Sequence, residues 1–164
     1  MSKVIIADTG PLIAFGLINK FSILAKLFET IIIPQTVADE CLADKTWPGA
    51  PTILQAVSNK IIQIHPDPSL VKSDDLLNIL DKGEAAAIKL AHSLNIPLII
   101  DEKLGRSVAK NLGIKVIGTV GILLLAKQRN LIKKIKPIIM LLKNEGYYLS
   151  DALIKEILTH AKEI

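Results

Sequence analysis

VIIADTGP, at residues 4–11, is the stretch that decides the fold of this chain. Val4–Ala7 is a short apolar run rich in β-branched residues, which predicts a buried strand. Asp8-Thr9-Gly10 is typical of a turn, and Pro11 suits the first position of a helix because its missing N–H is not needed there. A buried strand that passes directly into a helix indicates a parallel sheet covered by helices.

The same pattern recurs along the chain. Strands are expected at Val4–Ala7, Thr30–Ile33, Ile61–His65, Pro97–Ile100 and Ile114–Ile117. Helices are expected over Pro11–Phe28 with a break near Asn19-Lys20, and over Gln35–Leu42, Thr52–Ser58, Val71–Leu80, Glu84–Leu94, Lys103–Leu112, Val120–Arg129, Leu131–Lys143 and Ser150–Lys162, the last with Ser150 as its N-cap. We therefore predict a three-layer α/β/α fold with a doubly wound, mainly parallel sheet of about five strands.

Composition sets the broad class of the protein. Half of its 164 residues are hydrophobic and few are aromatic, which suits one domain, residues 1–164, with helices from roughly 131 to 164 packed on it. The net charge of +4 permits a polyanionic partner but does not require one. Cys41 is the only cysteine, which excludes an intrachain disulfide and a thiolate metal cluster. The sequence has no signal peptide and no apolar run of membrane-spanning length, so we expect a cytoplasmic protein.

Four acidic residues are predicted to gather at one edge of the sheet. Asp8 follows the first strand and Asp101 the fourth, and ligands of parallel sheets bind beyond the carboxyl ends of the strands, where the strand order reverses. Glu84 begins the helix that leads to the fourth strand, and Glu40 lies in the helix after the second. Two carboxylates about 5 Å apart repel by roughly 3 kcal/mol, so the cluster needs protons or a cation. Oxygen ligands favour Mg²⁺ or Mn²⁺, which can activate water for attack on a phosphodiester.

Each of these acids also has an ordinary structural explanation. Asp8 is compatible with a simple turn residue, and Asp101 with a cap on the helix that follows it. Glu84 complements a helix dipole, and Glu40 is compatible with a solvated position in a helix body. Taken singly, the four positions leave the function undecided.

Four motifs occur in the order typical of PIN-domain proteins. Ala7–Ile13 resembles their opening, an apolar strand followed by Asp-Ser/Thr, and Ile33–Glu40 resembles their second motif, Pro-x-x-Val-x-x-Glu. Gly83–Ile88 resembles the third motif, Gly-Glu-x-x-Ala, and Ile99–Glu102 resembles the fourth, a strand that ends in Asp. Any one motif is weak evidence, but four in order across nearly the whole chain are strong.

The chain is also similar to a VapC-like, toxin-type subgroup that is often described only as nucleic-acid-binding. The shared features are Asp101-Glu102 with Arg106, then Gly113-Ile114, then Gly118-Thr119-Val120-Gly121. This resemblance implies a PIN-like fold and a metal-dependent endoribonuclease that uses Mg²⁺ or Mn²⁺ and has RNA as its substrate. It further implies a homodimer and an antitoxin protein as partners, since many members are toxins of toxin–antitoxin pairs.

The resemblance also implies which residues bind metal and catalyse the reaction, namely Asp8, Glu40, Glu84 and Asp101. One position departs from the pattern. Many toxin-type PIN proteins have a further Asp two residues after the fourth acid, where this chain has Lys103. Glu102 is a candidate auxiliary acid in its place. The departure puts activity in question more than fold.

Other residues are candidates for contacting the substrate. Thr9 has three alternatives: a bond to the preceding carboxylate, a bond to the scissile phosphate, or an ordinary turn role. Thr119 is expected to be an N-cap, although it is also a candidate for binding substrate, and Arg106 either binds phosphate or pairs with a nearby acid. Lys133–Lys136 is interpreted as a solvated helix face rather than a track for RNA. Trp47 either packs against a partner or stacks on a base.

Three functions are consistent with these observations. The first is a metal-dependent endoribonuclease that leaves a 5′-phosphate and a 3′-hydroxyl. The second is a catalytically weak nucleic-acid-binding module that has kept the fold, which Lys103 favours. The third is a nucleotide-binding or phosphotransfer domain, and it ranks last because no phosphate-binding glycine loop follows the first strand.

Overall fold

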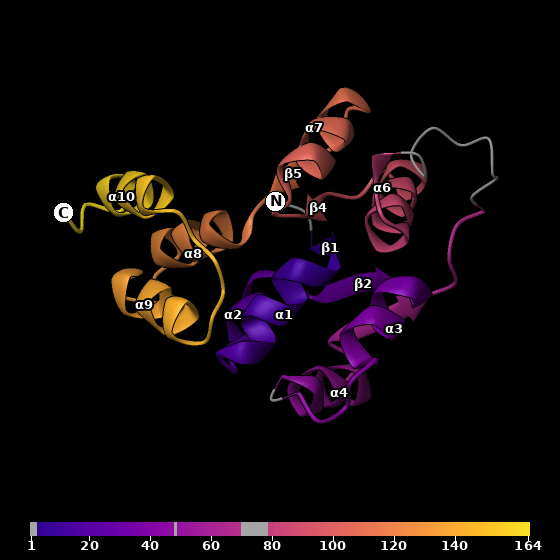
Figure 1. Ribbon diagram of the computed structural model, residues 1–164, viewed down its shortest axis with the longest axis horizontal. Coiled ribbons are helices and arrows are strands. Elements are labelled where there is room, and N and C mark those ends of the chain that lie inside the picture. The colour runs from indigo at the N-terminus through magenta and orange to yellow at the C-terminus, as the bar shows by residue number, and fades with distance from the viewer. Residues whose placement is uncertain (1–2, 48, 70–78) are drawn as a thin grey trace.

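The computed structural model describes residues 3–47, 49–69 and 79–164 (Figure 1). Its strands are β1 (Val4–Ala7), β2 (Thr30–Pro34), β3 (Ile62–His65), β4 (Leu98–Ile99) and β5 (Val116–Ile117). Its helices are α1 (Thr9–Leu17), α2 (Phe21–Leu27), α3 (Gln35–Leu42), α4 (Ala50–Ser58), α6 (Lys82–Leu94), α7 (Lys103–Asn111), α8 (Thr119–Gln128), α9 (Lys136–Asn144) and α10 (Asp151–His160). The helix expected over Val71–Leu80 lies almost entirely outside the described residues.

The strands pair in parallel in the order β3-β2-β1-β4-β5. The chain first builds outward from β1 to β3 and then crosses back to add β4 on the other side of β1. Strand order therefore reverses between β1 and β4. The prediction of an α/β fold with a doubly wound, parallel sheet of five strands is confirmed.

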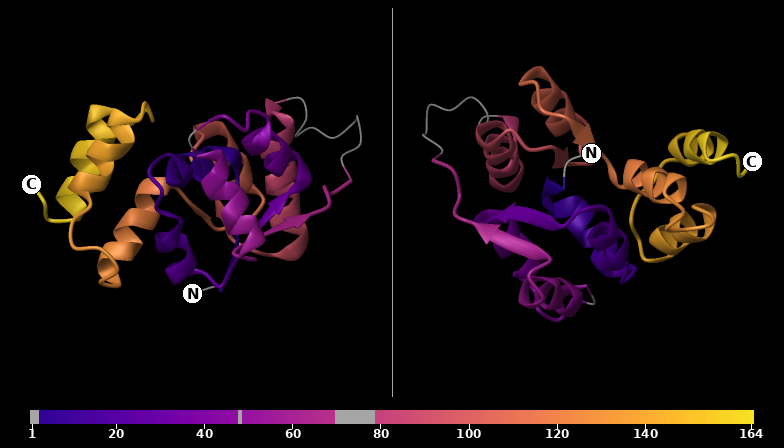
Figure 2. Two further views of the ribbon diagram at one scale, coloured as in Figure 1. Left: turned by 90° about the horizontal axis from the view of Figure 1, so that it is seen from below. Right: turned by 180° about the vertical axis from the view of Figure 1, so that it is seen from behind.

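Helices cover the sheet through small and aliphatic side chains. Helix α6 packs on β1 and β2, and its buried face is built from alanines and Ile88. Helix α3 packs against both α1 and α6. Helices α8, α9 and α10 gather at one end of the molecule, away from α3 and α6 (Figures 1 and 2). Among the described residues, no helix is both long and apolar enough to cross a bilayer.

The helix expected over Leu131–Lys143 was placed wrongly at its start, because α9 begins only at Lys136. Helix α8 is closed by Asn130, whose φ of 60° is left-handed and stops the helical path. Pro137 lies in the first turn of α9, and a helix extended further back would clash with its ring and lack its N–H. Lys133–Lys136 is thus mainly a connecting segment and not a helix face.

The start of α9 is capped by an acid from the C-terminal segment. The Glu163 carboxylate accepts hydrogen bonds from the backbone N–H groups of Ile135 at 2.8 Å and Lys136 at 3.0 Å. It also pairs with the Lys127 ammonium group at 2.9 Å. An anion at a helix N-terminus satisfies donors that otherwise lack partners. Glu163 therefore ties the C-terminal segment to both α8 and α9.

Candidate active site

Asp8 and Asp101 lie at the point where strand order reverses. Strands β1 and β4 are neighbours, with Ala7 paired to Ile99. The backbone N–H of Asp8 donates to the Ile99 carbonyl oxygen at 3.0 Å. Asp8 is buried, with 6% of its surface exposed, and Asp101 is half-buried. Asp8 and Asp101 therefore lie side by side at the same edge of the sheet.

Glu40 and Glu84 reach this edge from α3 and α6, the two helices that pack against each other. Gly83 permits the close approach, because a Cβ at that position would lie 2.4 Å from Oε2 of Glu40. The Thr9 hydroxyl donates to the same carboxylate oxygen at 2.6 Å. Glu40 is thus exposed to solvent but has a specific partner, the Thr9 hydroxyl, at the sheet edge.

The four acids line one pocket of about 490 Å³. The other residues that line it are Thr9, Gly10, Pro11, Ile13, Asp81, Glu102, Tyr147 and Tyr148. Sequence reasoning missed Asp81, although an Asp three residues before Glu84 is a typical helix N-cap, and its carboxylate does accept a bond from the Glu84 N–H at 2.8 Å. It also missed Tyr147 and Tyr148, which belong to none of the motifs.

Asp101 is held by three hydrogen bonds. The Thr119 N–H donates to Oδ1 at 2.7 Å, and the Thr119 hydroxyl donates to Oδ2 at 2.5 Å. The Tyr147 hydroxyl also donates to Oδ2. Residues from two distant parts of the chain therefore fix the orientation of this carboxylate.

The expectation that Thr119 is an N-cap is wrong, and the alternative of Asp101 as a cap is not realised. Asp101 does not cap the helix that follows it, because Glu102 fills that position and accepts bonds from two N–H groups of α7 at 3.1 and 2.6 Å. Thr119 is not the N-cap of α8, because Gly118 is, and Thr119 is the first residue of that helix. The reason is the same in both cases: the side chain of Asp101 is turned toward α8 and the site.

The remaining candidates for substrate contact have local partners. The Thr9 hydroxyl bonds to Glu40, as described above, while the Thr9 backbone N–H acts on the Asp8 carboxyl and lowers its pKa against the larger effect of burial. The Arg106 guanidinium donates to the Ile100 carbonyl oxygen at 2.9 Å, so it supports the backbone just before Asp101. Lys103 is exposed at the start of α7. A role of Thr9, Arg106 or Thr119 in binding substrate stays a prediction.

Two acids of the pocket, Asp8 and Glu84, have raised pKa values. Burial first, and then the charges of neighbouring acids, above all Asp81, raise the pKa of Asp8 from 3.8 to about 7. Burial, again followed by the charge of Asp81, raises the pKa of Glu84 from 4.5 to about 8. Both shifts have the sign expected for carboxyls that share a low-dielectric site without a counter-charge. A bound cation would supply that charge.

The donor set fits a hard divalent cation. Among the described residues, Oδ1 of Asp8 is the buried side-chain oxygen left without a hydrogen-bond partner, and a buried polar atom of this kind needs an explanation. The ligands available around it are carboxylate oxygens, which suit Mg²⁺ or Mn²⁺ better than zinc. No ready-made group of three metal-ligating side chains occurs within residues 3–47, 49–69 and 79–164.

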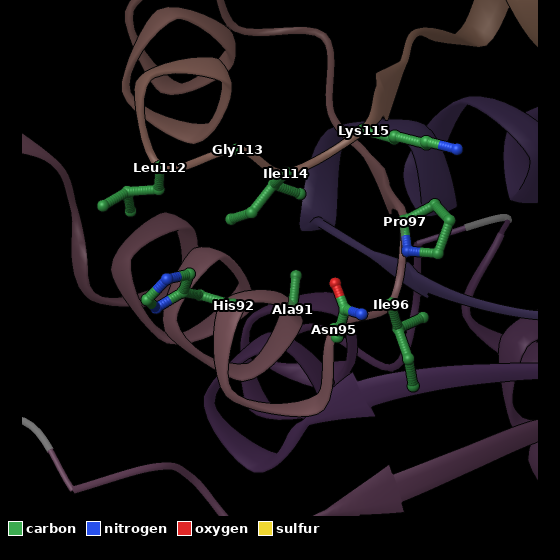
Figure 3. Close-up of a pocket in the computed structure, with 9 residues that line it drawn as sticks. All are labelled: Ala91, His92, Asn95, Ile96, Pro97, Leu112, Gly113, Ile114 and Lys115. Atoms are coloured by element: carbon green, nitrogen blue, oxygen red, sulfur yellow. The ribbon is translucent and has the colours of Figure 1, made fainter.

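A second hollow, of about 460 Å³, lies at the opposite edge of the sheet (Figure 3). Pro97 and Lys115, which line it, come just before β4 and β5. Figure 3 shows the side chains of His92 and Lys115 pointing away from each other. Charged groups do not converge there, so the acid pocket is the better candidate for chemistry.

Trp47 packs against its own chain. A Cβ at Gly16 would lie 3.1 Å from its ring carbon Cη2, and the ring also covers Gly49 and contacts the core. This packing within the chain differs from both alternatives for Trp47, contact with a partner and stacking on a base, and these stay predictions.

Solved structures resemble the chain in fold. A domain of a functionally unknown protein from Methanocaldococcus jannaschii is 21% identical with a TM-score of 0.51, over 71% of this chain and 91% of that chain. A PilT N-terminus domain protein from the hyperthermophilic archaeon Sulfolobus solfataricus is 16% identical with a TM-score of 0.45, over 90% of this chain and 97% of that chain. The second likeness is too weak to carry an argument, and no protein of curated function matches the chain.

The sequence itself gives the family. The family model described as "PIN domain" matches residues 4–163, which is nearly the whole chain. PIN domains are generally dependent on divalent metal, in keeping with the acid pocket. The match over residues 4–163 therefore shows that this chain belongs to the PIN-domain family, a nuclease-type superfamily.

Proposed function

We propose that this protein is a metal-dependent endoribonuclease in which Mg²⁺ or Mn²⁺ is bound by Asp8, Glu40, Glu84 and Asp101. The observation that carries the proposal is the pocket at the strand-order reversal, which is lined by all four acids and holds an unpartnered oxygen of Asp8. Membership of a nuclease-type superfamily supports the same conclusion.

The chain's own residues would prepare this site. Thr9 orients Glu40, while Thr119 and Tyr147 orient Asp101, so two ligands are already held in place. Bound Mg²⁺ or Mn²⁺ would neutralise the carboxylates and activate a water for attack at phosphorus, which leaves a 5′-phosphate and a 3′-hydroxyl. An RNA phosphodiester is anionic and is repelled by bare carboxylates, so cleavage must depend on divalent metal.

Cleavage of single-stranded RNA tests the proposal. The wild-type protein should cut with Mn²⁺ or Mg²⁺ and stop in EDTA. Asp101→Asn should abolish cutting, because it removes a ligand charge with little change in volume. The matched control is Asp39→Asn, an exposed acid of α3 directly before Glu40 that does not line the pocket; it should cut like wild type. Binding of RNA without cleavage across divalent metals would overturn the proposal.

The second candidate function is a nucleic-acid-binding module with weak or no catalysis. Two observations favour it: Lys103 occupies the position of a further acid, and both Glu102 oxygens are engaged by N–H groups of α7. Glu102 is therefore not a free substitute for the missing carboxylate. Under this alternative, RNA would bind to Asp101→Asn and to wild type equally well, and neither protein would cut.

The VapC-like resemblance extends the leading proposal to a toxin role in the cytoplasm, with an antitoxin protein as partner and a homodimer as the working form. Induced expression of wild type should then arrest cell growth, and Asp101→Asn should not. Light scattering gives the mass in solution, and the mass of a monomer would refute the homodimer.

A further inference from the structure

The loop between α9 and α10 brings both tyrosines of the chain to the acid pocket. Helix α9 ends in a Schellman motif: the N–H of Gly146 donates to Lys143 and that of Tyr147 to Leu142, both at 3.0 Å. Gly146 has a φ of 88°, which a glycine adopts without strain. Backbone hydrogen bonds to the last turn of α9 therefore fix the start of the loop.

Tyr147 fastens this loop to the site. Its side chain is half-buried, and its hydroxyl donates to Oδ2 of Asp101. Gly10, at the start of α1, lies against the same hydroxyl, since a Cβ there would be 3.9 Å from it. The position of the next residue, Tyr148, is therefore set relative to Asp101, because adjacent Cα atoms are about 3.8 Å apart.

Tyr148 differs from every other aromatic residue of the chain. The three phenylalanines are buried, Trp47 packs against the core and Tyr147 is half-buried. Tyr148 is 85% exposed. An isolated exposed apolar residue needs no special explanation, but this ring stands at the rim of the pocket that holds the four acids.

Tyr148 also lines another hollow, next to the acid pocket. This hollow, of about 360 Å³, shares Tyr147 and Tyr148 with the acid pocket and extends to Lys143 and Ser150. The Lys143 ammonium lies 3.9 Å from an Asp151 carboxylate oxygen, and both side chains are exposed, so its charge remains accessible to a phosphate. The lining of this hollow therefore contains an aromatic ring shared with the acid pocket, the cation of Lys143 and its exposed partner Asp151.

We infer that Tyr148 is a base-stacking residue, which receives an unpaired base next to the scissile phosphate, with Lys143 beside the following phosphate. Aromatic faces bind bases of any identity by stacking, and a nearby cation neutralises the backbone. This inference rests on the proposed RNA substrate. Tyr147 is the positioning residue that sets the stacking face relative to Asp101.

RNA binding measured by fluorescence anisotropy tests the inference. Labelled single-stranded RNA is titrated in Mg²⁺ with protein carrying Glu84→Gln, to prevent cutting. Adding Tyr148→Ala should weaken binding about 5- to 100-fold, and Tyr148→Phe should bind like the parent because it keeps the aromatic face. Tyr148→Leu, which keeps apolar area but no aromatic face, should be nearly as weak as Tyr148→Ala. Met140→Ala, an exposed apolar residue of α9, is the matched control and should change nothing.

Two further readouts separate stacking from a loss of structure. In a series of RNAs, a single abasic site is placed at a different position in each. At one position the missing base should weaken binding by the parent protein but not by the protein that also carries Tyr148→Ala. In cleavage assays without Glu84→Gln, Tyr148→Ala should raise KM with little change in kcat. If Tyr148→Ala binds RNA as tightly as its parent, or if the parent does not bind RNA, the inference is wrong. If Tyr148→Ala still cuts RNA with an unchanged KM, the stacking role of Tyr148 is refuted but the proposed nuclease activity is not. If the base-stacking tests succeed but no protein cuts RNA, only the proposed nuclease activity is refuted.

Discussion

Asp8→Asn should change how the stability of the metal-free protein depends on pH. The raised pKa of Asp8 means that the folded protein holds this proton more tightly than the unfolded chain does. Its contribution to the free energy of unfolding is therefore complete below pH 3.8 and is lost as the pH rises through about 7. A pKa change from 3.8 to about 7 corresponds to about 4 kcal/mol, an upper value for one carboxyl.

Asparagine has nearly the same shape as aspartate and never ionises, so the free energy of unfolding of the variant does not fall with rising pH through this group. A buried amide without full partners costs about 1–3 kcal/mol, but that cost is the same at each pH. In EDTA, the wild-type free energy of unfolding should thus fall by up to about 4 kcal/mol relative to Asp8→Asn between about pH 4 and about pH 8. For a chain of this size, that is a relative shift in Tm of roughly 10 °C.

Urea unfolding followed by circular dichroism, at several pH values, measures this difference. Mg²⁺ added at neutral pH should raise the Tm of wild type, because it binds only the folded state, and should do little for Asp8→Asn. Parallel curves of unfolding free energy against pH for the two proteins would refute the account of Asp8 as a buried carboxyl that ionises with difficulty.

Three further changes probe the surroundings of the site. Gly83→Ala should weaken Mg²⁺ binding about 10- to 100-fold in calorimetry, because its Cβ displaces Glu40; unchanged affinity would show that Glu40 is not a ligand. Lys103→Asp should raise the cleavage rate at low Mn²⁺ concentration if a missing acid limits metal binding, and an equal rate would remove that explanation. Glu163→Ala should lower the free energy of unfolding by about 1–2 kcal/mol through loss of the α9 cap; unfolding at the wild-type urea concentration would contradict it.

Local patterns were sufficient to predict much of the fold. Val4–Ala7 formed the strand that its β-branched run predicts, and the break near Asn19-Lys20 separates α1 from α2 as expected. The Ser150 hydroxyl accepts the N–H of Leu153 at 3.1 Å, which confirms its capping role. These features depend on neighbours in the sequence, so the sequence pattern contains the information that determines them.

The features that were missed depend on contacts between distant segments. Tyr147 meets Asp101 across a separation of 46 residues in the sequence, and no local pattern encodes that contact. The late start of α9 follows partly from Glu163, which caps it from far along the chain. Asp81 is the exception, since its spacing to Glu84 is a local signal that was available.

The bond between Tyr147 and Asp101 also bears on the order in which the site matures during synthesis. A chain is made and begins to fold from its N-terminus, and all four acids precede residue 102. A nascent chain that has emerged only as far as α8 would carry the acids and Thr119, but not Tyr147 or Tyr148. Asp101 would then lack one of its three hydrogen bonds, and the two tyrosines that line the pocket would be missing. If the protein cuts RNA as proposed, the site is therefore complete only after the loop between α9 and α10 has left the ribosome.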